Sequence, residues 1–261
     1  MSAMTIDTNI NLERWPFRRL SLEETSKLVA KLKASGVTQA WAGSFDGLLH
    51  RDIAAVNQRL ADACRQFADL LRPFGTVNPV LPDWHEDLRR CHEVHKMPGL
   101  RLHPNFHGYT LDDPRFAELL SLATDRGLIV QLALAMEDER TQHALHRVPH
   151  VDPKPLAGVV AKLPKLRLVL LNAFRSLSLL QCGEVAKAGQ VWFDIAMLES
   201  VAGVTKLIEK VSPERVLFGS HSPLFYFESA ELKLVESGLP EAVLQQIRIG
   251  NAMKLLAVSS D

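Results

Sequence analysis

Three polar side chains near the start of the chain have types and a spacing that could build a binding or catalytic site. Asp7, Asn9 and Asn11 alternate with other residues in the stretch TIDTNINLERWPFR. Side chains two residues apart share one face of a β-strand, so one face would carry a carboxyl and two amide groups. The bulky residues Trp15 and Phe17 follow at once and would cover the end of the strand. This arrangement favours an enclosed polar site, and an edge strand with a solvated face is the alternative.

Polar residues also stand at the ends of most other apolar runs. The candidates are Asp7, Asn9, Asn11, Asn78, Arg101, His103, Gln131, Glu137, Asp138, Arg140, Asn172, Asp194 and His221. One polar residue at the end of a strand is expected, because a loop must begin there. Convergence from seven strands would instead indicate a ligand site.

The elements that must position these residues alternate regularly along the chain. Apolar runs predict strands at the start of the chain and at 37–45, 71–78, 100–104, 128–134, 166–172, 191–196 and 215–223. Helical periodicity predicts helices between them, including 52–67, 114–126, 176–188 and 198–211, and two more at 227–236 and 240–257. Eight strand-helix alternations in 261 residues are typical of a (β/α)₈ TIM barrel, here with an extra C-terminal helix.

We expect residues 1–261 to form one barrel domain, because no linker-like stretch divides them. A doubly wound open sheet is the structural alternative. No GxGxxG or GxxxxGK[ST] loop follows any predicted strand, so a nucleotide-binding version would lack its phosphate loop. In a barrel, the C-terminal ends of the strands meet at one mouth, where barrel enzymes carry their active sites.

The composition argues against several classes of function. Lys plus Arg and Asp plus Glu balance at 30 each. No basic run is present, which argues against nucleic acid or anionic lipid as a partner. No segment approaches the roughly 18 continuous apolar residues of a membrane span. The three cysteines are widely spaced and form no CxxC, which argues against a disulfide framework or a thiolate metal site.

We therefore expect a cytoplasmic protein whose partner is a small-molecule substrate or ligand. Nucleic acid and membrane are not expected as partners. The sequence leaves the oligomeric state open, although a homodimer is the commonest soluble assembly.

Several strand-end phrases resemble those of a known family. The order IDTNIN, LRLHP, LIVQLA, LRLVLLNA, VLFGSHSP and IRIGNAMKLL is similar to that of the amidohydrolase-related (amidohydrolase 2) family of metal-dependent TIM-barrel hydrolases and decarboxylases. The resemblance covers nearly the whole chain. It implies a TIM barrel that hydrolyses or decarboxylates a small carboxylate-bearing substrate.

The chain departs from this family at the metal-ligand positions. Asn9 and Asn11 stand at the two first-strand histidines, Ala133 and Asn172 at the histidines of the fifth and sixth strands, and His221 at the eighth-strand aspartate. An amide oxygen is a weak donor to zinc and its relatives, and alanine is no donor. We therefore expect a degenerate metal site and no metal cofactor at the family's own position.

Three functional interpretations follow. The first is a metal-independent enzyme with His221, His103, Asp7 and Glu137 as candidate catalytic acids and bases. Its substrate would be held by Asn9, Asn11, Arg18, Arg101, Arg140, Asn172 and Asp194, with a guanidinium on the substrate carboxylate. The second is a hydrolase with a divalent metal such as zinc, relocated to His103, His221 and an acid. The third is a catalytically inactive binding or scaffold barrel.

Each candidate also has a purely structural interpretation. His221 could be a hydrogen-bonded histidine that fills the space of a metal, and Asp7 could anchor the backbone of its strand. Asp194 could pair with an arginine across the barrel. The segment from Glu137 to Arg140 could be a solvated turn whose charges pair locally.

Overall fold

Eight parallel strands form the centre of the molecule in this computed structural model, which describes residues 4–144 and 147–257. Their order in the sheet follows the sequence, β1 to β8, and every neighbouring pair is parallel. The strands are β1 Thr5–Leu12, β2 Val37–Ser44, β3 Leu71–Gly75, β4 Gly99–Leu102, β5 Ile129–Ala133, β6 Arg167–Leu171, β7 Val191–Asp194 and β8 Val216–Leu217. The predicted (β/α)₈ TIM barrel is confirmed.

Backbone hydrogen bonds between the first strand and the segment after the last close the barrel. Thr8 N donates to Phe218 O at 2.9 Å, and Asn11 N donates to Ser222 O at 2.8 Å. Ile10 and Ser222 form a parallel bridge. The polar exits of β1 and β8 are thereby held side by side.

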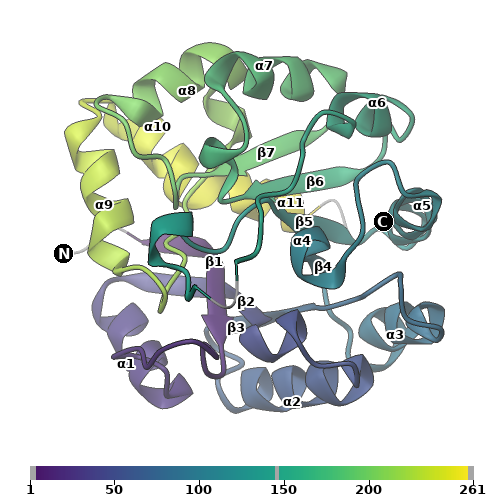
Figure 1. Ribbon diagram of the computed structural model, residues 1–261. Coiled ribbons are helices and arrows are strands. Elements are labelled where there is room, and N and C mark those ends of the chain that lie inside the picture. Colours follow the sequence, from purple (N-terminus) through teal and green to yellow (C-terminus); the bar gives the residue numbers. More distant parts are fainter. Residues whose placement is uncertain (1–3, 145–146, 258–261) are drawn as a thin grey trace.

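Helices surround the strands, as Figure 1 shows with α7 and α8 on one side of the barrel and α2 and α3 on the other. They are α1 Thr25–Ala34, α2 Ile53–Gln66, α3 Trp84–Arg89, α4 Pro104–His107, α5 Pro114–Asp125, α6 Leu156–Ala161, α7 Leu179–Ala188, α8 Gly203–Val211, α9 Phe227–Glu236, α10 Glu241–Gln245 and α11 Asn251–Ala257. The predicted helices at 52–67 and 114–126 are confirmed within a residue at each end. Asp52 and Asp113 begin them, because each side chain accepts a hydrogen bond from the first turn.

Two predicted helices begin later than the apolar pattern indicated. The helix predicted at 198–211 begins at Gly203, and the one predicted at 176–188 begins at Leu179. The preceding residues belong to the loops after β7 and β6. Local periodicity did not detect this, because Leu177 and Leu198 are buried by tertiary contacts although they lie outside a helix.

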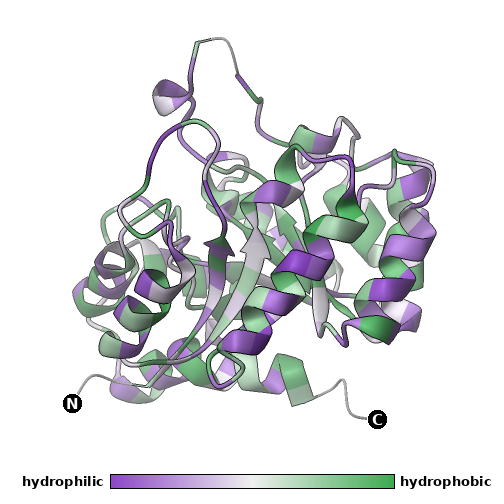
Figure 2. Cartoon of the chain, turned by 90° about the horizontal axis from the view of Figure 1, so that it is seen from below, coloured by the Kyte–Doolittle hydropathy of each residue, from purple (hydrophilic) through white to green (hydrophobic). Residues whose placement is uncertain are grey.

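The apolar core has two layers, which follow the alternation of side chains along each strand. Outward residues such as Val130 and Leu168 pack against the helices in one cluster. Inward residues such as Trp41, Ile129 and Val169 fill the barrel in a second cluster. Figure 2 shows the matching mixture of apolar and polar residues along the surrounding helices. Among the described residues, no helix is long and apolar enough to cross a membrane.

The first strand departs from strict alternation. Its pairing with β2 shifts between Asp7 and Ile10, and Ile6 packs inside the barrel whereas Ile10 and Leu12 pack outside. All eight residues of β1 are buried, so the alternative of a solvated face is wrong.

Gly99 lets β4 lie close to its neighbours, and its replacement tests the packing inside the barrel. A Cβ at this position would overlap Ile129 O and would lie 2.5 Å from Phe74 Cε1. We expect Gly99→Ala to lower the free energy of unfolding by about 1 to 3 kcal/mol, as overpacking does.

The control is Gly158→Ala in α6, where a Cβ meets nothing within 4 Å. Alanine is favoured over glycine in a helix by roughly 0.5 to 1 kcal/mol, so this variant should gain stability. Urea unfolding followed by circular dichroism measures both changes. Equal changes in the free energy of unfolding of the two variants would contradict the close packing around Gly99 inside the barrel.

Candidate functional site

A buried network of polar side chains occupies the barrel at the C-terminal ends of its strands; we call it the barrel-end cluster. Its members are Asp7, Asn9, Asn11, Arg101, His103, Gln131, Asn172, Asp194, Ser220 and His221. Each is at most 1% exposed. The structure therefore brings together nine of the strand-end candidates, because every member except Ser220 belonged to that prediction.

Arg101 is the centre of one half of the barrel-end cluster. Its Nε donates to Gln131 Oε1 at 2.8 Å, and its Nη1 donates to Ile10 O at 2.6 Å and to Asn11 Oδ1 at 3.0 Å. Its Nη2 donates to Trp41 O at 3.0 Å. Burial lowers the pKa of Arg101 to about 9, and interactions with Asp194 and Asp7 oppose that shift. The guanidinium donors are thus used in hydrogen bonds to the inner wall of the barrel.

Asn9 connects the other half of the barrel-end cluster. Its Nδ2 donates to Asp194 Oδ2 at 2.7 Å and to Asn172 Oδ1 at 3.1 Å. Asn172 in turn donates through Nδ2 to Ala135 O at 2.8 Å and through its backbone N to Asp194 Oδ1 at 2.9 Å. Burial raises the pKa of Asp194 to about 6.

Asp7 holds the exit of β8. Its Oδ1 accepts from Ser220 N at 2.9 Å and from Asn9 N at 3.1 Å, and its Oδ2 accepts from Ser220 Oγ at 2.5 Å. Burial raises the pKa of Asp7 to about 7, although these hydrogen bonds lower it. A carboxyl with this pKa can hold or release a proton near neutral pH.

His221 lies just past β8 with a positive φ of 60°. Its backbone N donates to Asn9 O at 2.7 Å, which holds the residue in this unfavourable conformation. Its Nε2 lies 2.7 Å from Met136 O. A carbonyl oxygen can only accept, so Nε2 carries the proton and Nδ1 is the basic nitrogen. Burial lowers the pKa of His221 to about 4.

His103 follows β4 and is fully buried. Neither of its ring nitrogens has a hydrogen-bond partner among the described residues. Burial holds the pKa of His103 well below its usual range, and the nearby His107, Arg101 and His221 lower it further.

The barrel-end cluster is a poor donor set for the metal that the resemblance implies. The Oδ1 atoms of Asn11 and Asn172 already accept hydrogen bonds, and Ala133 offers no donor. The guanidinium of Arg101 adds a positive charge beside Asn11. Within residues 4–144 and 147–257, no three His, Cys, Asp or Glu side chains are grouped as a metal ion requires. These residues do not fit the family's metal, and the expectation of no metal cofactor stays a prediction.

The loops that follow β5, β6 and β7 line a second polar site, which we call the mouth pocket. Its volume is about 790 Å³. It is lined by Asp138, Glu139, Arg140, His150, Phe174, Arg175, Leu177, Ser178, Leu179, Met197, Leu198, Glu199 and Ser200. The loop that supplies Asp138 also supplies Ala135 O and Met136 O to the barrel-end cluster, so the two sites share a wall.

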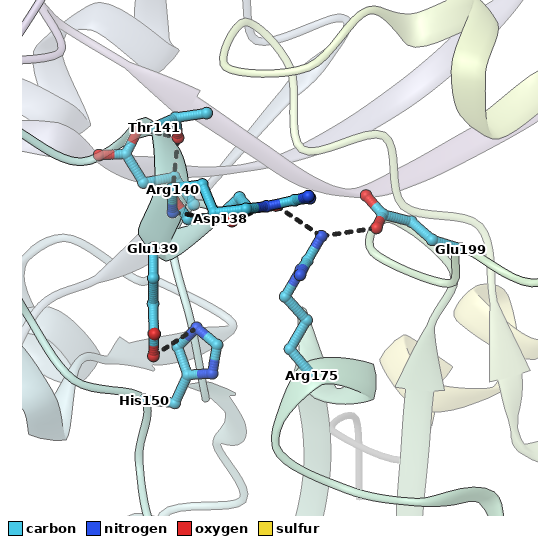
Figure 3. Close-up of polar contacts among 8 residues, drawn as sticks. Asp138, Glu139, Arg140, Thr141, His150, Arg175 and Glu199 are labelled. Carbon is cyan, nitrogen blue, oxygen red and sulfur yellow. Dashed lines mark hydrogen bonds and ion pairs between the residues drawn. The ribbon is translucent and has the colours of Figure 1, made fainter.

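Two guanidinium groups meet at one carboxylate in the mouth pocket. Asp138 Oδ2 lies 2.5 Å from Arg140 Nη2 and 2.8 Å from Arg175 Nη2. Arg175 Nη2 also lies 2.7 Å from Glu199 Oε2. Figure 3 shows Arg175 extending toward both carboxylates, and Glu139 directed at His150. The Glu139 Oε1 to His150 Nε2 distance is 3.8 Å.

The remaining predicted site residues lie apart from the barrel-end cluster. Arg18 Nη1 donates to the buried Glu137 Oε2 at 2.6 Å. Two of the predicted candidates, Asp138 and Arg140, line the mouth pocket. Asn78, another strand-end candidate, accepts a hydrogen bond from Val80 N and closes its own turn.

Arg175, Glu199 and His150 were not predicted as site residues. Arg175 and Glu199 follow β6 and β7 closely, which is the available signal, but the apolar pattern predicts a helix over 198–211. His150 belongs to a histidine-containing loop whose His146 lies outside the described residues.

Comparison with known proteins assigns the chain to a family. The family described as Amidohydrolase matches residues 18–258. The chain belongs to the amidohydrolase family. The resemblance seen in the strand-end phrases of this amidohydrolase chain is confirmed. No curated protein matches it.

Solved structures share the fold of this amidohydrolase chain at low identity. A dihydroxybenzoic acid decarboxylase from Polaromonas, with bound manganese and the inhibitor 2-nitroresorcinol, is 13% identical with a TM-score of 0.77, covering 99% of this chain and 98% of its own. A 5-carboxyvanillate decarboxylase from Novosphingobium aromaticivorans, also with manganese, is 15% identical with a TM-score of 0.77, covering 97% of each chain. A 2,6-dihydroxybenzoate decarboxylase complexed with 2,6-dihydroxybenzoate is 14% identical with a TM-score of 0.74, covering 97% of this chain and all of that one.

Replacement of Arg101 tests the charge balance of the barrel-end cluster. Arg101→Met removes a donor from Asn11 Oδ1, Gln131 Oε1 and two carbonyls, and it removes a cation that interacts with Asp7 and Asp194. We expect the free energy of unfolding to fall by about 3 to 5 kcal/mol, as when one partner of a buried charge network is removed.

The control is Arg126→Met, because Arg126 is only half-buried and donates to Leu122 O in its own helix. Its effect should stay within about 0.5 kcal/mol. Urea unfolding reports both values. A loss at Arg101 no larger than that at Arg126 would show that the guanidinium does not organise the barrel end.

Proposed function

We propose that this chain is a hydrolase or decarboxylase that binds a small carboxylate-bearing substrate in the mouth pocket. The observation that carries the proposal is the meeting of Arg140 and Arg175 at Asp138 Oδ2. Two guanidinium groups are already arranged around a carboxylate there. A substrate carboxylate can bind the same pair, and Glu199, which is half exposed, can move away from Arg175.

The pocket also holds a group that can move protons. Decarboxylation breaks a carbon-carbon bond, releases CO₂ and leaves a carbon that takes up a proton. Hydrolysis requires a base that accepts a proton from the attacking water. His150, beside Glu139, is placed to serve either reaction at the pocket wall. Asp7 and His221, which belong to the barrel-end cluster, lie on the other side of the wall that the two sites share. Nδ1 of His221 is the basic nitrogen there.

We also propose that the reaction proceeds without a divalent metal at the strand ends. The support is the donor set, in which three amides, one imidazole and one alanine stand at the family's ligand positions. Proton transfer by side chains would then replace the activation of water by a metal. A metal relocated to His103 and His221 would have to bind beside the Arg101 guanidinium, which acts on the pKa of both histidines.

The burial of the barrel-end cluster favours a second candidate function. In it, the barrel binds the same carboxylates but does not catalyse their reaction. Asp7, His103 and His221 are fully buried. Assays of bound carboxylates for release of CO₂ or of hydrolysis products separate the two functions.

Removal of Arg175 tests the carboxylate site. We expect Arg175→Gln to weaken binding of benzoate and related carboxylates roughly tenfold, because a charged hydrogen-bond donor is lost. Isothermal titration calorimetry measures the affinity. The control is Arg89→Gln, another partly exposed arginine that bonds two carboxylates, Glu86 and Glu93, on a distant helix. Unchanged binding by Arg175→Gln would refute the proposed pocket.

Metal content tests the second part of the proposal. Protein purified without a chelator should contain far less than one zinc, manganese or iron per chain by elemental analysis. Dialysis against EDTA should leave both the melting temperature and the carboxylate affinity unchanged, because the barrel end carries its own cation. Near-stoichiometric metal, or a fall in melting temperature with EDTA, would disprove metal independence.

A further inference from the structure

Negative side chains outnumber positive ones in the mouth pocket. Asp138 and Glu199 lie beside two guanidinium groups, those of Arg140 and Arg175, whereas Glu139 lies beside His150. Asp138 is shared between both arginines. The pocket therefore has a cationic centre and additional carboxylates at its rim.

The rim carboxylates are accessible and incompletely paired. Glu199 is 52% exposed, and its Oε2 accepts one hydrogen bond, from Arg175. Glu139 is 61% exposed, and its distance of 3.8 Å from His150 is longer than a hydrogen bond. Both glutamates can accept further hydrogen bonds from a bound molecule.

The rest of the lining is largely apolar. It is formed by Phe174, Leu177, Leu179, Met197 and Leu198. A ligand that fills the pocket would thus place an apolar body against these side chains. Its carboxylate would bind at the arginine pair, and its other substituents would point to the rim.

We propose that the mouth pocket selects a zwitterionic ligand, in which an apolar body joins a carboxylate to a cationic nitrogen. The carboxylate binds Arg140 and Arg175, and the ammonium group binds Glu199. A second carboxylate in place of the ammonium group is disfavoured, because it would be held against Glu199 and Glu139. This inference rests on the proposed carboxylate site and specifies its substrate class.

Three compounds with one aromatic body test the proposal. Benzoate carries the carboxylate alone, 4-(aminomethyl)benzoate adds an ammonium group at the far end, and terephthalate adds a second carboxylate there. We expect 4-(aminomethyl)benzoate to bind about two- to fivefold more tightly than benzoate, the range of a partly exposed ion pair. Terephthalate should bind less tightly than benzoate. Calorimetric titration at low ionic strength measures all three affinities.

Glu199→Gln identifies the residue that creates the preference. In this variant 4-(aminomethyl)benzoate and benzoate should bind equally, and terephthalate should gain affinity. The matched control is Glu86→Gln, since Glu86 is also 52% exposed and is also paired with an arginine, Arg89. The control should keep the preference of the unmodified chain.

The outcomes separate this inference from the proposed function. Binding of benzoate that depends on Arg175, without any gain from the ammonium group, would overturn the zwitterion inference and leave the carboxylate site intact. A preference that survives Glu199→Gln would likewise overturn it. Failure of all three compounds to bind would overturn the carboxylate site as well.

Discussion

The rest of the structure depends on the hydrogen bonds that one buried guanidinium, that of Arg101, donates inside the barrel. Arg101 ties β4 to β1, β2 and β5 through side-chain and carbonyl oxygens. A buried charge is costly unless it is hydrogen-bonded and compensated, so these strands can pair only in a register that supplies the acceptors. Gly43 on β2 provides the room, because a Cβ there would lie 2.7 Å from Arg101 Cδ.

The barrel end and the mouth pocket divide the polar residues between two environments. The barrel-end cluster is buried, most of its members are hydrogen-bonded to one another, and its carboxyls and imidazoles have pKa values shifted toward their neutral forms. The mouth pocket is open, and its ion pairs lie partly in solvent, where they can exchange partners with a ligand. The segment after β5 joins the two, since Met136 O accepts from His221 and Asp138 pairs with Arg175.

The amidohydrolase family supplies the fold of this chain but does not by itself fix its chemistry. Two of the solved structures with this fold have bound manganese. Here amides and a guanidinium occupy the strand ends. The side chains of Asn9, Asn11 and Asn172 make hydrogen bonds at this barrel end, but their amide oxygens are weaker donors to a cation. The loops after β5, β6 and β7 carry the groups that can meet a small molecule.

The sequence alone determined the barrel, because alternating apolar runs and helical periodicity are local signals that eight repetitions reinforce. It also identified the polar strand ends, including Asp7, Asn172 and His221, which the parallel topology then had to bring together. Only the tertiary structure decided which of them are enclosed together in the barrel. Arg101 is enclosed because its acceptors come from three other strands, and the mouth pocket joins Arg175 to Asp138 and Glu199 across three loops. Such contacts depend on the relative placement of distant segments, which no local pattern contains.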